Sequence, residues 1–453
     1  MAGSIIVSSI TLDSDNNFSI KSNTGATLFF ANTTGIDIAN SIGATAITND
    51  KILSVANTKI TGNIISSQIT SVANTQLTGT ITGSQISSNT LSNTVFQTGS
   101  VENYMNSQNL GFGMRNRIIN GAMVIDQRNG GASVNPTDGQ GTVDQWRAAR
   151  SQASKITVQQ NAGAVTPPVG FSNYLGVTSS SAYTVLAADY FFLFTKIEGF
   201  NFADMAWGTA NAQTITLSFW VRSSLTGTFG GSVLNSAQNR SYPFTYTINA
   251  ANTWEKETIT IAGDASGTWI GATNGVGLQL YFGLGVGSTG SGTAGAWAAA
   301  GYQSATGATS VVGTNGATFY ITGVQLEKGS TATSFDYRPF GTELALCQRY
   351  CCVIPINSNG VGQGIIGPWG ANYNATNGRV WYNMPVTMRA TPSVSLSGNQ
   401  YSIIGVNDTA TGTNANFHYS NQVISFDGTS LSTSSATGQP LSYRGGGLIT
   451  AEL

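Results

Sequence analysis

Short segments in which apolar and polar residues alternate, separated by glycine-rich turns, fill the chain from about residue 109 onward. Thr214–Arg222 alternates up to Trp220, and Glu257–Ala262, Gly277–Phe282 and Thr318–Leu326 follow the same period of two. This is the side-chain period of a β-strand with one buried face. Asn-Gly dipeptides, which supply the positive φ angles of tight hairpins, begin at residues 120, 129, 274, 315, 359 and 377. The pattern predicts antiparallel β-sandwiches and an all-β fold.

One segment interrupts this pattern of short strands and turns. Thr342–Cys351 (TELALCQRYC) predicts a helix capped by Thr342, because Leu344, Cys347 and Cys351 fall on one face at i, i+3 and i+7. After this segment the sequence again predicts short strands separated by turns, in Arg379–Asn383, Ser393–Leu396, Tyr401–Val406 and Asn421–Phe426.

The charge content excludes several classes of protein. Charged residues make up 9% of the 453 residues, with 19 Lys and Arg against 20 Asp and Glu, whereas soluble domains carry about 25%. A charge-rich disordered protein and a charged coiled coil are therefore excluded, and a net charge of −1 argues against a nucleic-acid partner. The most apolar run, Val185–Phe194, is too short to span a membrane and contains Asp189. We expect neither membrane insertion nor, from the N-terminal residues, a signal peptide.

An internal repeat lies in the first hundred residues. Residues 54–70 (SVANTKITGNIISSQIT) and 71–87 (SVANTQLTGTITGSQIS) repeat with a period of 17. Each unit has only a thin stripe of Ile, Val and Leu, which it cannot bury alone and must pack on neighbouring units or other chains. We predict an intertwined β-rich stalk here; a disordered linker is the alternative.

Motifs for cofactors, metals and catalysis are weak. Gly285–Gly290 (GVGSTG) matches the nucleotide-binding glycine pattern but lacks the acidic residue that should follow it. Asp13–Asn17 resembles the start of a calcium loop but lacks the later glycine and glutamate. The cysteines, Cys347, Cys351 and Cys352, and the single His418 could form a zinc site, but the sequential pair diverges in direction, so buried thiols are expected. We therefore predict no cofactor, no metal and no catalytic residues.

Aromatic and amide side chains suggest a binding role instead. Sugars bind by stacking their C–H faces on aromatic rings, while amides and charged groups bond the hydroxyls. The segment from Trp369 to Tyr382 is rich in both kinds of side chain, and Trp297 lies in a second candidate loop. An ordinary hairpin with alternate side chains in the core is the alternative. The candidate glycan-binding residues are Trp369, Asn372, Tyr373, Asn374, Arg379, Tyr382 and Trp297.

The chain resembles bacteriophage tail-fibre and receptor-binding proteins, especially those of phages of marine bacteria and cyanobacteria. Gly113–Gly131 with Val143–Trp146 is similar to the opening edge of their sandwich module, and Phe319–Lys328 with Phe335–Pro339 to its closing strand. Thr342–Tyr350 and the Thr/Gly/Ile repeats resemble their connecting helix and stalk.

The resemblance implies an elongated homotrimer in the virion tail, attached through its N-terminus to a baseplate or other tail protein. It also implies a jelly-roll-like sandwich of the carbohydrate-binding-module type and a partner in the host cell-surface polysaccharide. The expected organisation is a tail-attachment segment over 1–50, a stalk over 51–108, a sandwich over 109–341, and a short helix with a receptor-facing β tip domain over 342–453. The expected function is host attachment without enzymatic activity; a non-binding tail spacer and a polysaccharide depolymerase are the alternatives.

Overall fold

The structure is a computed structural model that describes residues 18–21, 27–32, 35–37, 114–354, 369–398, 400–403, 408–432 and 437–453. The chain divides into two units, Met1–Ser92 and Asn93–Leu453. In the first, β1 (Phe18–Lys21), β2 (Thr27–Asn32) and β3 (Gly35–Asp37) form a three-stranded antiparallel sheet. The repeat at 54–87, and with it the predicted stalk, lies outside the described residues.

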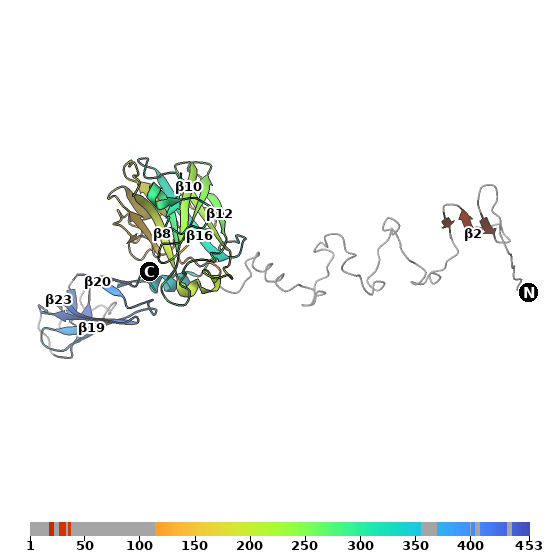
Figure 1. Cartoon of the computed structure of the whole chain (residues 1–453). Coiled ribbons are helices and arrows are strands. Elements are labelled where there is room, and N and C mark those ends of the chain that lie inside the picture. Colours follow the sequence, from red (N-terminus) through yellow and green to blue (C-terminus); the bar gives the residue numbers. More distant parts are fainter. Residues whose placement is uncertain are drawn as a thin grey trace, which may run out of the picture. The chain divides into compact units, whose positions relative to one another are not determined.

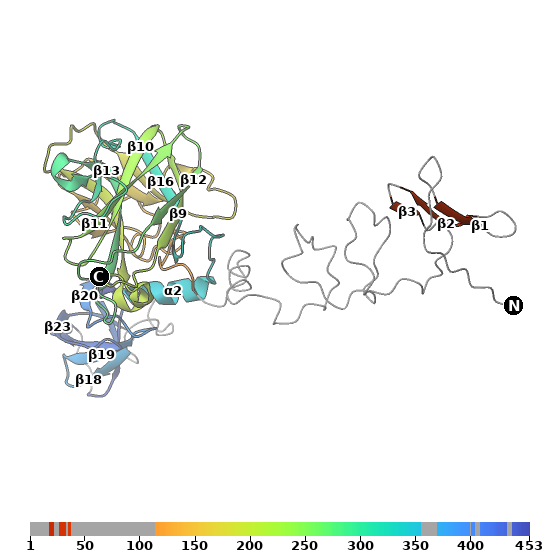
Figure 2. The same cartoon turned by 45° about the vertical axis from the view of Figure 1, so that its right-hand side comes forward.

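A sandwich of two antiparallel sheets makes up the first part of the second unit (Figures 1 and 2). One sheet has the order β11-β10-β13-β8-β5-β4, and the other the order β12-β9-β16-β7-β6. Most connections cross from one sheet to the other, as in jelly-roll sandwiches. The predicted all-β sandwich is confirmed. Its strands are β4 (Gln140–Gly141), β5 (Trp146–Arg150), β6 (Ile156–Gln160), β7 (Leu175–Ser179), β8 (Tyr190–Glu198), β9 (Ile215–Ser223), β10 (Gly227–Leu234), β11 (Ser241–Ile248), β12 (Glu255–Ile261), β13 (Val276–Val286) and β16 (Thr318–Lys328).

Short elements occupy the connections between these strands. They are the 3-10 helices η6 (Ala162–Ala164), η7 (Gly199–Asn201), η8 (Ala203–Met205) and η9 (Ser288–Gly290), and the paired strands β14 (Ser291–Gly292) and β15 (Ser304–Ala305).

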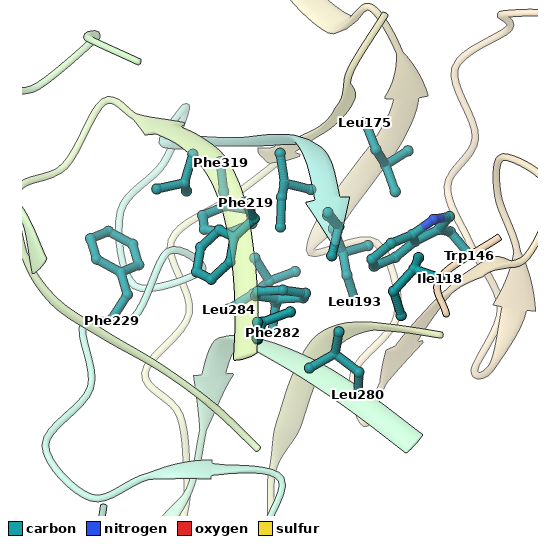
Figure 3. Close-up of a cluster of buried hydrophobic side chains, with 14 of the residues drawn as sticks. Ile118, Trp146, Leu175, Leu193, Phe219, Phe229, Leu280, Phe282, Leu284 and Phe319 are labelled. Atoms are coloured by element: carbon teal, nitrogen blue, oxygen red, sulfur yellow. The ribbon is translucent and has the colours of Figure 1, made fainter. Parts of the chain in front are cut away.

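The sandwich core lies between the two sheets (Figure 3). Phe219 of β9 meets Phe282 of β13 edge-on, with ring centroids 5.0 Å apart, and Trp146 of β5 lies 6.2 Å from the same Phe282 ring. Each such side chain is fully buried, and burying one contributes about 1.5–3 kcal/mol to folding. Alternate residues of both sheets therefore hold the sandwich together.

The Asn-Gly at residue 120 does not form the expected hairpin. Asn120 is buried, and its side chain bonds the main chain of Ile125 and the carbonyl of Asp144. A Cβ on Gly121 would lie 2.1 Å from the Val324 carbonyl oxygen, so only glycine allows the loop to approach β16 this closely. The dipeptide docks the segment on the sandwich, whereas Asn377-Gly378 does close a hairpin between two strands.

The helix prediction was wrong at both ends. Helix α2 runs from Phe340 to Gln348 with Pro339 as its N-cap, so Thr342 lies inside it. Cys351 is not on the helix face but begins strand β17 (Cys351–Ile354). Pro339 explains the early start, because its fixed φ and missing N–H are tolerated only at a helix N-terminus.

Two further sheets follow the helix. A three-stranded sheet has the order β17-β26-β20, and a seven-stranded sheet has the order β22-β21-β25-β18-β19-β24-β23. Val380, Phe426, Leu441 and Tyr443 form a buried cluster among the strands of the larger sheet. The strands are β18 (Trp369–Asn372), β19 (Gly378–Asn383), β20 (Ser393–Ser397), β21 (Gln400–Ile403), β22 (Asp408–Thr411), β23 (Thr413–Tyr419), β24 (Val423–Thr429), β25 (Pro440–Tyr443) and β26 (Gly446–Thr450).

A buried carboxylate joins the sandwich to the segment that leads into these sheets. Glu198, at the end of β8, accepts two hydrogen bonds from the Arg349 guanidinium, at 2.9 and 2.6 Å, and one from the Tyr350 hydroxyl at 2.6 Å. The Glu198 side chain is 1% exposed. Arg389 adds a second link, because it exchanges hydrogen bonds with Asn274 of the sandwich.

Candidate functional site

Strand β8 carries aromatic side chains on both of its faces. Phe191, Leu193 and Ile197 lie in the sandwich core. The alternate residues Tyr190 and Phe192, followed by Phe194 and Lys196, therefore lie on the outer face of the six-stranded sheet. An outer face normally meets water and carries polar residues. Here Phe192 and Phe194 are each only 7% exposed, so other side chains of the same chain cover most of this apolar row.

The strands beside β8 extend this row into an aromatic floor. Phe194 pairs in register with Tyr281 of β13 on one side and with Arg147 of β5 on the other. The Phe194 and Tyr281 rings stack 5.4 Å apart at 16°, and Phe192 meets Tyr281 edge-on at 4.6 Å. Ala149 and Leu234 complete the cluster.

Polar side chains rise around the floor and enclose a hollow of about 370 Å³, within the size range of small-ligand sites. Its rim carries three glutamines, one aspartate and one lysine, listed by position as Asp138, Lys196, Gln238, Gln279 and Gln303. We call the floor and rim together the outer groove.

The connection between β13 and β16 forms one wall of the outer groove and brings Gln303 to it. Cβ atoms on Gly230 and Gly283 would lie 2.5 and 2.6 Å from Ser304 Oγ. The two glycines of the sheet are therefore what allows this wall to rest directly on the strands.

Hydrogen bonds hold the polar rim in place. The Tyr281 hydroxyl donates to Gln279 Oε1 at 2.9 Å, and Gln279 Nε2 donates to the Asn235 carbonyl at 2.8 Å. At the other end, the Tyr190 hydroxyl donates to Asp138 Oδ2 at 3.0 Å. The side chains are thus oriented before any ligand arrives, which reduces the entropy cost of binding.

Burial shifts the titration of the groove residues. It raises the pKa of Tyr281, so this hydroxyl stays protonated and able to donate. Burial, aided by the nearby Arg147 and Arg389 charges, lowers the pKa of Lys196 to about 8. Lys196 is therefore mostly charged at neutral pH, but burial and the nearby arginines destabilise its charged form.

The lining of the outer groove is poor in carboxylates. Retaining and inverting glycosidases mostly use two carboxylates facing one cleft. Of the described residues that line the groove, only Asp138 carries a carboxylate, and it is already bonded to Tyr190.

Trp297, one of the candidates from the sequence, lies in an aromatic cluster against the sandwich core. Its ring meets Trp207 edge-on at 5.1 Å and Trp269 at 5.6 Å, and its Nε1 donates to the Ala262 carbonyl at 2.9 Å. Arg240 lies 5.8 Å from the ring centroid. These contacts give Trp297 a packing role and leave it outside the outer groove.

The β18–β19 hairpin brings some of the other candidates together. Arg379 binds Asp427 through Nε and Nη2, at 2.7 and 3.2 Å, and the Tyr373 hydroxyl donates to the same carboxylate at 3.3 Å. Burial works to raise the pKa of Asp427, but these bonds and one from Asn416 outweigh it and lower the pKa overall. Tyr373 is 46% exposed, so its ring is open to solvent. Asn374 is exposed in the hairpin loop, where its side chain accepts a bond from the Thr376 main chain.

The remaining candidates between Trp369 and Tyr382 differ in their exposure to solvent. Asn372 is buried, at 2% exposure. Tyr382 packs beside Cys352 in a small core, and burial, followed by that thiol, raises the pKa of Tyr382 to about 12. The side chain of Trp369 lies outside the described residues. Trp381, which the sequence analysis did not select, is 44% exposed on this sheet.

The cysteines lie in a buried region around the end of α2. All three are free thiols, and burial raises the pKa of Cys351 to about 12 and of Cys352 to about 11. Within the described ranges, no group of three or more His, Cys, Asp and Glu side chains is placed to hold a metal ion. None of the helices in those ranges is long and apolar enough to cross a membrane.

The outer groove was missed in the sequence, although a signal for it was present. Val185–Phe194 stood out only as an apolar run too short for a membrane. Read as a strand in an antiparallel sheet, Tyr190, Phe192 and Phe194 would all lie on the face opposite the core. Finding Gln238, Gln303 and Asp138 around them required the tertiary structure, because these residues come from three separate connections.

No family model matches this chain, and no curated protein matches it. Among solved structures, the enzymatically active domain of tailspike protein 4 of bacteriophage CBA120 is similar over 43% of this chain, with 12% identity and a TM-score of 0.25. This chain covers only 21% of that tailspike chain.

Two carbohydrate-binding modules are also similar. TmCBM61, solved with β-1,4-galactotriose, matches over 48% of this chain and 100% of its own, with 11% identity and a TM-score of 0.25. The family 11 module of a cellulosomal cellulase of Clostridium thermocellum matches over 45% of this chain and 99% of its own, with 12% identity and a TM-score of 0.22.

Proposed function

We propose that this chain binds a saccharide in the outer groove of its sandwich. The observation that carries the proposal is the convergence of an aromatic floor and an amide-rich rim in one hollow of about 370 Å³. An apolar floor matches the C–H face of a sugar ring, and fixed amides match its hydroxyls.

Each part of the groove has a role in this binding. Phe192 and Phe194 are only 7% exposed, so they offer a narrow apolar strip, and the more exposed Tyr190 ring extends it toward solvent. Gln238 and Gln303 present amide donors and acceptors from the rim. Their mixed donor and acceptor capacity suits vicinal hydroxyl groups.

We further propose that the chain is a homotrimeric bacteriophage tail fibre that attaches the virion to a host-surface polysaccharide. The resemblance of its sequence segments, its low charge content and the 17-residue repeat support this assignment. Residues 1–50 would attach to the baseplate or another tail protein, 51–108 would form the stalk, 109–341 the sandwich and 342–453 the receptor-facing tip. Three weak sites on one stalk would raise avidity by about 10²–10⁴ over one site.

The seven-stranded sheet offers a second candidate surface for the same function. Tyr373 and Trp381 are 46% and 44% exposed, and the Arg379–Asp427 pair lies in the same sheet. Exposed aromatic rings beside a charged pair can contact a saccharide chain.

A glycan array probed with the full chain and two groups of variants tests the proposal. Gln238→Ala and Tyr190→Ala should lose binding, while Gln422→Ala, an exposed glutamine in the turn before β24, should keep it. If Trp381→Ala loses binding and the groove variants do not, the second surface is the site. A chain that binds no glycan on the array or on host cells would be the tail spacer, and new reducing ends after incubation with host polysaccharide would identify a depolymerase.

A further inference from the structure

Two cations stand over one end of the outer groove. Arg147, opposite Phe194 across the β5–β8 pair, has its guanidinium carbon 5.9 Å from the Phe194 ring centroid. Lys196 Nζ lies 5.9 Å from the same centroid. The other end of the groove carries Asp138, which accepts a hydrogen bond from the Tyr190 hydroxyl. Tyr190 and Lys196 are both on β8, and their main chains are about 20 Å apart along the strand.

Positive charge predominates around the Lys196 end, although the whole chain is almost neutral. Arg147 and Arg389 lie near enough to Lys196 to repel its charge, and the Glu452 carboxylate lies 3.9 Å from Arg147. Arg128 also pairs with Glu452 and lies beside the Asp144 carboxylate, so its charge is balanced within the chain.

Main-chain oxygens of the last residues take up part of the donor capacity. Arg389 donates to the oxygens of Ala451 and Glu452, at 2.9 and 2.7 Å. Lys196 and Arg147 donate to that of Leu453, at 3.0 and 3.3 Å. Arg147 also donates from Nε to the Gly139 carbonyl at 2.7 Å. A lysine ammonium has three N–H donors, so Lys196, which lines the groove, can donate further into it.

The Lys196 ammonium would be stabilised by an anion. Its lowered pKa has two causes, burial and the repulsion from Arg147 and Arg389. Neighbours on β13, Gln279 and the protonated Tyr281, supply no compensating charge. A carboxylate or sulfate placed beside Lys196 would counter both causes.

We infer that the outer groove selects an anionic saccharide, one bearing a uronate carboxylate or a sulfate ester, with the acidic group held beside Lys196 over the Phe194 ring. This inference rests on the proposed function and names the ligand class of the same site. The inference also sets the direction in which the saccharide lies in the groove, because the acidic sugar lies at the Lys196 end and a neutral sugar at the Asp138 end.

An array of matched saccharide pairs tests the inference with the full chain. Each uronate oligosaccharide is printed beside its carboxyl-reduced form, and each sulfated one beside its desulfated form. We expect about tenfold or greater preference for acidic members, from charge-assisted hydrogen bonds. The two arms show whether carboxylate or sulfate is the group recognised. Equal binding of acidic and neutral members would overturn the inference but leave the proposed function intact, whereas binding to neither would overturn both.

Variants localise the effect. Lys196→Gln should lower acidic affinity about tenfold more than neutral affinity, and Lys196→Arg should retain the preference. Lys256→Gln, which removes an exposed cation from β12 in the other sheet, is the matched control and should change neither. If Lys256→Gln lowers acidic binding as much as Lys196→Gln does, the preference is a general charge effect and the proposed pocket is wrong.

The pH dependence gives an independent readout. Acidic affinity should fall as the pH rises through about 8, where free Lys196 loses its proton, while neutral affinity stays flat. Raising the ionic strength from about 0.01 M to about 1 M, which shortens the Debye length from ~30 to ~3 Å, should weaken acidic binding only. Acidic binding that is constant across both series contradicts a role for Lys196.

Discussion

At the scale of single residues, Trp297 and Trp381 carry the same indole in opposite surroundings. Trp297 packs edge-on against Trp207 and Trp269, while Trp381 is 44% exposed. Because the Trp297 ring is partly buried, we predict that Trp297→Ala costs about 1–3 kcal/mol and lowers Tm by about 2–12 °C. Trp381→Ala should stay within about 0.5 kcal/mol. Thermal unfolding of the two variants checks this, and equal losses would mean that the exposed ring also supports the fold.

Lys196 gives a prediction about stability and pH. Its pKa is about 8 in the folded chain against an ordinary value of 10.5, so between these pH values the unfolded chain binds more protons. The free energy of unfolding should therefore rise with pH in this window, relative to the variant Lys196→Met, and the difference should be flat below pH 8. Thermal scans of both proteins at about pH 7, 9 and 10.5 measure it. A free energy of unfolding that falls with pH in this window, relative to Lys196→Met, would show that folding does not lower the pKa of Lys196.

At the scale of elements, the junction after α2 depends on one buried carboxylate. Removing one partner of such a pair leaves an uncompensated charge and costs about 3–5 kcal/mol. Arg349→Ala should therefore destabilise the chain strongly, and Arg349→Lys should have an intermediate effect, because lysine cannot reproduce the two-point contact with Glu198.

Urea unfolding of the two Arg349 variants measures this effect. Gln422→Ala, in an exposed turn, is the control and should unfold with the native chain. An Arg349→Ala variant as stable as the native chain would show that Tyr350 and Arg389 hold the junction without it.

At the scale of the whole molecule, we expect the spaced apolar stripe of the repeat to hold three chains together. Replacing Ile60, Ile64, Leu77 and Ile81 with Asn should convert the proposed trimer to monomers, because a thin stripe has no partner within one chain. Light scattering measures the mass, and the melting of the sandwich should be unchanged. A variant that remains trimeric, with a separate sandwich interface excluded, would remove the role of the repeat.

The sequence by itself determined the elements with a clear local signal. The period of two in Thr214–Arg222 and Thr318–Leu326 predicted β9 and β16 to within two residues, because a strand buried on one face must alternate. The helix at residues 340–348 was predicted in type but displaced, since Leu344 and Cys347 show the periodicity while Pro339 determines the start.

Only the tertiary structure decided which polar and aromatic residues share a site. Tyr190, Gln238 and Gln303 lie far apart in the chain and meet through sheet order and a connection that rests on Gly230 and Gly283. The alternation of apolar and polar residues along a strand predicts which face of the strand is buried. It does not predict which distant segments of the chain pack on the opposite face. For the same reason Trp297, in a glycine- and alanine-rich segment that resembled a binding loop, was found among other tryptophans, where long-range packing places it.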